Sequence, residues 1–169
     1  MEADRSEREI VLPAHALSSL HSAIREQVGE DAADRALLAA GRAAGEAVLD
    51  GIETGLNEGA GALSESAFWS MLVSFFSRRG WGRLQHEDAH PGVGVLTGAD
   101  WAEGGDRPFT QGLLAGLLSR AAGAEVEVVR IPDGDGDGPS FAFGAAPTLR
   151  VLQRRLGEGD SLGAALGAL

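Results

Sequence analysis

Residues 108–131 read PFTQGLLAGLLSRAAGAEVEVVRI, in which a helical pattern is followed directly by a strand pattern. Pro108 suits the first position of a helix, and Gly123 suits its end. Gly112 and Gly116 are four residues apart, so they lie on one face of the helix and leave it without side chains. Another backbone or a flat ligand can approach closely along that face. This order of elements favours a binding fold and does not by itself name a reaction.

Two further helices are predicted upstream of this segment. Apolar residues recur at helical spacing over residues 12–28, and Gly29 ends this first helix. The second helix begins at about Asp31 and carries its own pair of small residues, Gly41 and Gly45. The same small-residue pattern therefore occurs on two separate helices.

A third helix has clear boundary signals, since Ser64 can cap its start and Gly80 can end it. Two strands follow, near residues 81–87 and 93–98, and a Pro-Gly turn joins them. Further strands flank an Asp-Gly tract, and two short helices close the chain. The pattern predicts an α+β fold.

The composition limits the classes of function. The 169 residues carry a net charge of −11, which opposes binding to nucleic acid. There is no cysteine for a disulfide or a thiolate metal site, and no lysine for a Schiff base or a P-loop. Only residues 1–9 have the composition of a disordered tail. No membrane span or signal peptide is visible, so a cytoplasmic protein is expected.

Four stretches occur in a familiar order: residues 10–13 (IVLP), residues 34–45 (DRALLAAGRAAG), residues 80–82 (GWG) and the glycine helix with Ser119. In this order and spacing the chain resembles the 4-vinyl reductase-type domain, a small-molecule-binding module whose fold is related to subunits of the transport protein particle (TRAPP) complex. The resemblance covers roughly residues 10–144. It implies a single domain over residues 10–169, in which helices pack on an antiparallel four-stranded sheet.

The resemblance further implies an enclosed apolar pocket and a homodimer formed through helices. The pocket candidates belong to the third and fourth helices and the segment between them: Trp69, Leu72, Phe76, Trp81, Trp101, Phe109, Gly112, Leu113 and Gly116. The dimer candidates lie on the first two helices: Leu17, Leu20, Ile24, Gly41 and Gly45. Aromatic residues at helical spacing are also ordinary core residues, so packing without a ligand is the alternative.

Sensor members of this family close the pocket with a zinc site of cysteines and a glutamate. The matching positions here are Arg107, Arg130, Asp133 and Phe141, and a single carboxylate cannot hold the metal. The resemblance therefore implies that this chain lacks the zinc site of the family. No metal and no cofactor are expected.

Residues 86–90 read HEDAH, which matches the H-E-x-x-H zinc-protease motif. That chemistry needs both histidines on one face of a helix, whereas glycines precede the string and Pro91 disfavours a helix at His90. A polar strand end or turn is the main interpretation, with an adventitious surface metal site as an alternative. The Asp-Gly repeats of residues 133–138 similarly imitate a calcium loop, and a hairpin turn is favoured there.

Three hypotheses of function follow. The first is a non-catalytic, dimeric sensor domain that binds a small apolar or aromatic molecule. The second is a protein-interaction adaptor resembling the TRAPP subunits, and a minor third is an enzyme component of tetrapyrrole metabolism. A closed apolar cavity of roughly a few hundred cubic ångströms would favour a ligand, whereas a filled interior would favour the adaptor.

Overall fold

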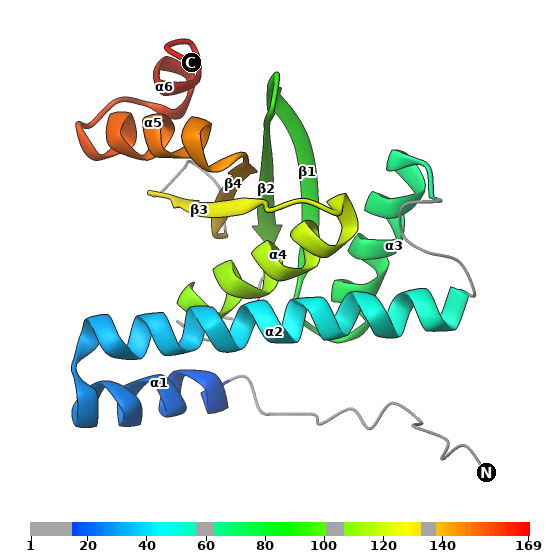
Figure 1. Cartoon of the computed structure of the whole chain (residues 1–169), viewed down its shortest axis with the longest axis vertical. Coiled ribbons are helices and arrows are strands. Elements are labelled where there is room, and N and C mark those ends of the chain that lie inside the picture. The colour runs from blue at the N-terminus through cyan, green and yellow to red at the C-terminus, as the bar shows by residue number, and fades with distance from the viewer. Residues whose placement is uncertain (1–14, 57–62, 101–106, 133–137) are drawn as a thin grey trace.

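The computed structural model describes residues 15–56, 63–100, 107–132 and 138–169. Its elements, labelled in Figure 1, are α1 (His15–Val28), α2 (Glu30–Leu56), α3 (Glu65–Arg78), β1 (Arg83–His90), β2 (Val93–Ala99), α4 (Arg107–Ala122), β3 (Glu127–Ile131), β4 (Ser140–Gly144), α5 (Ala146–Gly157) and α6 (Leu162–Leu166). The predicted tail of residues 1–9 lies outside the described residues.

The α1 and α2 helices form a helical hairpin along one side of the protein (Figure 1). Gly29 lies between them with φ +85°, a conformation that other residues rarely adopt, so the predicted helix end at this glycine is confirmed. Nε2 of His21 lies 2.9 Å from Oδ1 of Asp34 and ties the two helices together. The hairpin places α1 on the side of α2 that faces away from the sheet (Figure 1).

The backbones of α2 and α4 are in direct contact. A Cβ atom on Gly41 would overlap the carbonyl oxygen of Phe109. A Cβ atom on Gly45 would overlap the carbonyl oxygen of Leu113, one turn further along both helices. Because the contact points advance together, the two helices run in the same direction.

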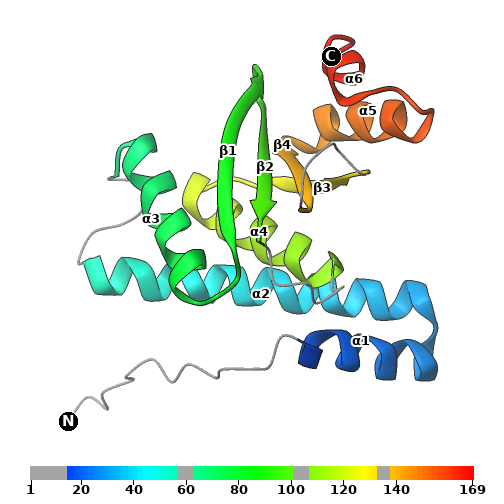
Figure 2. The ribbon, with the colours of Figure 1, turned by 180° about the vertical axis from the view of Figure 1, so that it is seen from behind.

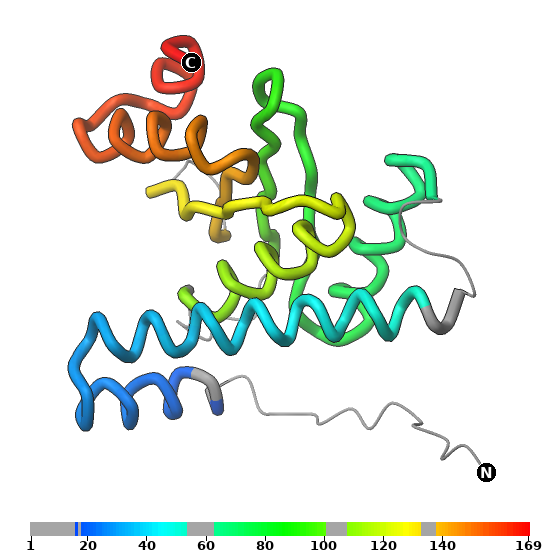
Figure 3. The backbone as a smooth tube through the Cα atoms, in the orientation of Figure 1, coloured from blue at the N-terminus to red at the C-terminus, as the bar shows by residue number. Residues whose placement is uncertain are grey.

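The glycines of α4 make the reciprocal contact. Gly112 faces the carbonyl oxygen of Leu38 and has no room for a Cβ atom. Gly116 faces the carbonyl oxygen of Arg42 in the same way. The close approach expected along this face is therefore made by another helix, and the trace in Figure 3 shows the two helices side by side.

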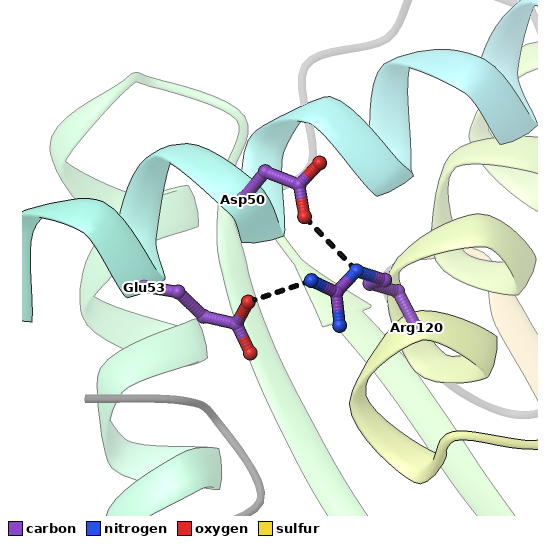
Figure 4. Close-up of polar contacts among 3 residues, drawn as sticks. All are labelled: Asp50, Glu53 and Arg120. Carbon is purple, nitrogen blue, oxygen red and sulfur yellow. Dashed lines mark hydrogen bonds and ion pairs between the residues drawn. The ribbon is translucent and has the colours of Figure 1, made fainter.

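One arginine links the same two helices near their C-terminal ends (Figure 4). Nε of Arg120 donates a hydrogen bond to Oδ1 of Asp50 at 2.9 Å, and its Nη2 donates to Oε2 of Glu53 at 3.0 Å. Because Arg120 is half exposed, solvent screens these pairs, and each adds roughly 0–1 kcal/mol to the free energy of unfolding. The glycine contact, rather than the arginine, sets the spacing of the helices.

The α3 helix begins at an N-cap. Oγ of Ser64 accepts a hydrogen bond from the backbone N–H of Ala67 at 3.3 Å, as the sequence predicts. After the helix, Gly80 (φ +72°) and Gly82 (φ +110°) turn the chain into β1. Trp81 therefore precedes the strand, whereas the sequence pattern predicts that it lies within the strand. Figure 2 shows α3 beside β1 at one edge of the sheet.

The four strands form one antiparallel sheet in the order β1-β2-β4-β3. The β1–β2 hairpin turns at Pro91 and Gly92, where Gly92 has φ +82°. This hairpin extends beyond β3 and β4 (Figure 2). The predicted α+β fold with an antiparallel four-stranded sheet is confirmed.

Helices cover both faces of the sheet. Alternation along the strands sends Leu84, Leu96 and Phe141 to the face that packs against α3 and α4. Val95 and Ala142 belong to the other face, which packs against α5 and α6. The two short helices predicted at the end of the chain are both present.

The α4 helix is enclosed along its central part. Residues 112–118 are all buried, because the glycine face meets α2 while the leucines meet the sheet and α3. A helix that is buried all round needs no polar face, which explains why this segment consists mainly of leucine, alanine and glycine. The position of α4 between α2 and the sheet therefore organises the larger of the two cores.

Replacing Gly112 by alanine is expected to destabilise the protein, because the added methyl group would force α2 and α4 apart. Overpacking of this kind lowers the free energy of unfolding by about 1–3 kcal/mol. Urea unfolding followed by circular dichroism measures the change. Gly163→Ala is the matched control, since this helical glycine has open space around it and is expected to be neutral or to gain up to about 1 kcal/mol. Equal behaviour of the two variants would contradict the α2–α4 contact.

Candidate functional site

An aromatic stack joins α3 to β1. The indole of Trp69 lies nearly parallel to the imidazole of His86, with 3.8 Å between the ring centroids and 14° between the planes. Trp69 lies in the second turn of α3, whose start is fixed by the Ser64 cap. His86 lies on the face of β1 that meets α3. The stack thus holds the imidazole in one position.

Phe143 of β4 completes the group. Its ring centroid lies 5.7 Å from that of Trp69 and 5.7 Å from that of His86. Phe143 is opposite Gly94 in the register of β4 and β2, and a Cβ atom on Gly94 would overlap the phenyl ring. The absence of a side chain at Gly94 therefore allows the phenyl ring to lie over β2 and reach the stack. We call Trp69, His86 and Phe143 the aromatic cluster.

Two polar atoms of the aromatic cluster are buried and have no hydrogen-bond partner among the described residues. They are Nε1 of Trp69 and Nε2 of His86. Oδ1 of Asp88 lies 3.4 Å from Nε2 of His86, which is within the range of an ion pair but long for a hydrogen bond. A buried polar atom without a partner costs about 1–3 kcal/mol. A bound group that paired with either nitrogen would remove that cost.

Carboxylates lie next to His86. Glu65 in the first turn of α3 and Asp88 in β1 each place one carboxylate oxygen within 4.8 Å of a ring nitrogen of His86. Both acids are exposed, and Asp88 follows His86 by two residues on the same face of the strand. The site thus combines an aromatic interior with an acidic rim.

A shallow depression of about 380 Å³, open to solvent, adjoins the aromatic cluster. Gly94, Val126 and Phe143 contribute its apolar lining, while Asp88 and Glu125 contribute acidic groups. Phe143 therefore touches both this depression and the Trp69–His86 stack. A second open depression, of about 320 Å³, lies at the turn between α1 and α2.

Several residues predicted to line an enclosed pocket are packed in the core. Leu72, Phe76 and Leu113 are almost fully buried. Trp81 packs edge-on against Phe76, with the ring centroids 5.9 Å apart, and its centroid lies 6.4 Å from that of Phe109. Leu72, Phe76 and Leu113 belong to one cluster of buried core residues. Trp101 lies outside the described residues.

The four glycines predicted as site residues are all buried in the contact between α2 and α4 of one chain. Gly112 and Gly116, predicted to line a pocket, face α2. Gly41 and Gly45, predicted to form a dimer interface, face α4. The α2–α4 contact thus occupies the glycine faces that were predicted to meet a ligand or a second subunit.

The remaining dimer candidates belong to α1. Leu20 is 50% exposed, and Ile24 is half-buried. Val28 on the same helix is 56% exposed, while the side chain of Leu17 lies outside the described part of the protein.

None of the helices in the described ranges combines the length and the apolar character needed to span a lipid bilayer.

The HEDAH string of residues 86–90 forms the end of β1, so of the two predicted forms, a strand end or a turn, the strand end is confirmed. Alternation along the strand places Glu87 on the face opposite to His86. A bulge then shifts the register between Asp88 and His90. The string therefore does not form the helical arrangement that a zinc protease requires.

The positions that match the zinc site of the family do not suit a metal ion. Arg130 of β3 lies directly opposite Phe141 of β4, and neither side chain is a metal ligand. Arg107 begins α4, and Asp133 lies outside the described residues. The residues described at these positions thus offer no set of zinc ligands.

Comparison with known proteins identifies relatives of the fold. No family model matches the chain, and no curated protein sequence does. Among solved structures, the phenol-responsive sensory domain of the transcription activator PoxR, with phenol, is similar over 92% of this chain and 83% of its own, with a TM-score of 0.62 and 13% identity. Subunit 3 of a trafficking protein particle complex from Naegleria fowleri, covalently bound to palmitic acid, is similar over 78% of this chain and 93% of its own, with a TM-score of 0.56 and 11% identity. At these identities the similarity shows a shared fold.

His86, Asp88 and Phe143 are not among the site residues predicted from the sequence. A period-two pattern places His86 on the same face as Leu84, and it places Phe143 on the same face as Phe141. That signal assigns both rings to the core side of the sheet. It does not reveal which helix covers them, so the contact with Trp69 emerges only from the structure.

Proposed function

We propose that this chain is a non-catalytic binding module for a small, neutral aromatic or apolar molecule, and that the aromatic cluster is its binding site. The observation that carries the proposal is the buried Nε1 of Trp69, an N–H donor without a partner among the described residues. An oxygen atom of a bound ligand would accept this hydrogen bond. The rings of His86 and Phe143 would contact the apolar part of the same ligand.

The surrounding charges disfavour an anionic ligand. Glu65 and Asp88 lie beside His86, and Glu125 lines the neighbouring depression. The whole chain carries a net charge of −11, so a carboxylate or phosphate group would be repelled. A neutral aromatic ring that carries one hydroxyl or carbonyl group fits both the hydrogen-bond donor and the charges.

Access to the indole nitrogen requires one side chain to move. Phe143 lines the open depression and also contacts the Trp69–His86 stack. Rotation of its phenyl ring would connect the depression to the stack. Gly94 lies beneath the ring and presents no side chain that would hinder this rotation. Binding would then leave the leucines of the core in place.

The structural neighbours support a ligand-binding role. The PoxR domain is phenol-responsive, and the trafficking-complex subunit is covalently bound to palmitic acid. The present sequence contains neither cysteine nor lysine, so it offers no thiol or amine side chain for a thioester or an amide with a fatty acid. This difference favours an aromatic molecule over a fatty acid.

The burial of several pocket candidates in the core cluster supports the second hypothesis, an adaptor that binds other proteins. Leu72 is fully buried and Leu113 is 4% exposed, and both were expected to line a central pocket. Leu20 and Val28 expose apolar surface on α1, and a homodimer formed through α1 would cover both. The cytoplasmic location and the tetrapyrrole-enzyme hypothesis stay predictions.

Phenol is the first probe of the proposed site, with toluene as the analogue that lacks the hydroxyl group. Phenol is expected to raise the Tm, because a ligand that binds only the folded state stabilises it. Trp69→Phe is expected to weaken phenol binding about two- to tenfold, through the loss of one hydrogen bond worth roughly 0.5–1.5 kcal/mol, and to leave toluene binding nearly unchanged. Isothermal titration calorimetry measures both affinities.

Trp81→Phe is the matched control for this experiment. Its indole packs on Phe76 in the core, and the variant retains the same number of tryptophans as Trp69→Phe. The control is expected to bind phenol as the wild type does. Equal weakening in the two variants, or the absence of saturable binding with phenol and other neutral aromatic molecules, would sink the proposal.

Native mass spectrometry tests the proposed homodimer. If α1 forms the interface, the wild type is expected at twice its mass of 17.4 kDa, and a Leu20→Glu, Val28→Glu double variant is expected as the monomer. Burying a charged side chain in an apolar interface is costly, which explains the expected dissociation. The control is the Ser19→Glu, Gln27→Glu double variant, which adds the same charges one residue before Leu20 and Val28. A monomeric wild type would exclude α1 as a homodimer interface.

A further inference from the structure

We propose that Glu65, His86 and Asp88 form a binding site for a divalent transition-metal ion of the Zn²⁺ class. The proposal does not rest on the aromatic ligand. Glu65 belongs to the first turn of α3, and the other two residues belong to β1. The site uses His86 and Asp88 of the HEDAH string but neither Glu87 nor His90.

The three donor groups are spaced as a metal site requires. One nitrogen of His86 and one carboxylate oxygen from each acid all lie within 4.8 Å of one another. Nε2 of His86 and Oδ1 of Asp88 are 3.4 Å apart. Ligand atoms at about 2.0–2.1 Å from a tetrahedral zinc ion are separated by about 3.3–3.4 Å. This pair therefore already spans one edge of a coordination tetrahedron, and the exposed side chain of Glu65 has the freedom to complete it.

The imidazole is prepared for coordination. The side chain of His86 is only 13% exposed, and the indole of Trp69 holds the ring by stacking on it. Nε2 is buried and has no hydrogen-bond partner among the described residues. A metal ion bound to Nε2 would satisfy this atom, as buried polar atoms in folded proteins require.

The ligand set indicates the class of metal. Imidazole nitrogen favours zinc and the neighbouring transition metals, whereas calcium and magnesium favour sites built from oxygen alone. The sequence has no cysteine, so no thiolate of the chain competes for the ion. Three protein ligands leave one coordination position for water or another oxygen donor.

The geometry of the strand separates these residues from the rest of the string. Glu87 points to the opposite face of β1. His90 lies beyond the bulge, and its Nδ1 lies 3.1 Å from the carbonyl oxygen of Pro91. Glu87 and His90 thus provide control positions of the same residue types within the same strand.

Zinc titration of the untagged, chelator-treated protein tests the site. Isothermal titration calorimetry with zinc chloride is expected to show one equivalent of bound metal. His86→Gln, Asp88→Asn and Glu65→Gln are each expected to weaken binding about tenfold or more, as loss of groups at a metal site does. Glu87→Gln and His90→Gln are expected to bind zinc as the wild type does.

Cobalt provides a second readout that is independent of stability. Binding of Co²⁺ is expected to produce visible absorption bands in the wild type and not in His86→Gln. Glu65 and Asp88 are exposed, so their amide variants are expected to retain the far-ultraviolet circular dichroism of the wild type. A loss of zinc affinity in these two variants then reports on the ligands and not on the fold.

Three results would overturn the proposal. The first is an absence of zinc binding by the wild type. The second is binding that survives all three ligand substitutions, which shows an adventitious ion only. The third is equal weakening by Glu87→Gln or His90→Gln. None of these titrations contains phenol, so the outcome is separate from that of the aromatic-ligand experiment.

Discussion

The direct backbone contact between α2 and α4 is the constraint on which the rest of the structure depends. Helices with ordinary side chains at their contact lie about 8–10 Å apart. Glycines on both helices here leave no room for a Cβ atom, so the approach is closer than such side chains would allow. The leucines on the rest of α4, including Leu114 and Leu117, are then fully buried against the sheet and α3. An outward shift of α4 would disturb all of these contacts at once, because protein interiors are closely packed.

The depth of α4 also decides where a binding site can lie. The α4 helix packs against β3, while α3 packs against β1 at the opposite edge. The centre of this layer is occupied by leucine side chains, and two buried polar atoms without a hydrogen-bond partner among the described residues, Nε1 of Trp69 and Nε2 of His86, lie at the border between α3 and the sheet. Gly94 contributes to this border, because its missing side chain allows Phe143 to reach Trp69 and His86. The buried leucine core and the peripheral aromatic cluster are therefore two results of the same packing.

Neighbouring residues in the sequence predict where helices begin and end. Which segment packs against a given helix face depends on contacts between residues far apart in the sequence, and a local pattern does not show these. The stop at Gly29 and the cap at Ser64 require only neighbouring residues, and both are confirmed. The spacing of Gly112 and Gly116 predicts a close approach but not whether a helix, a ligand or a second subunit makes it. The aromatic cluster is harder still to predict, because the stacking of Trp69 on His86 depends on how α3 packs against β1.

His86 belongs to both proposed sites, and this shared residue couples them. Any change that a metal ion makes in the affinity for an aromatic ligand must appear equally in the opposite direction. If the ligand enters by rotation of Phe143 alone, a metal ion that joins α3 to β1 would hold Trp69 and His86 in the binding arrangement. Ordering the site in advance lowers the entropy lost on binding, so the coupling would then be favourable. If the ligand must instead separate the indole from the imidazole, the same metal ion would oppose binding. The sign of the coupling therefore identifies which ring moves.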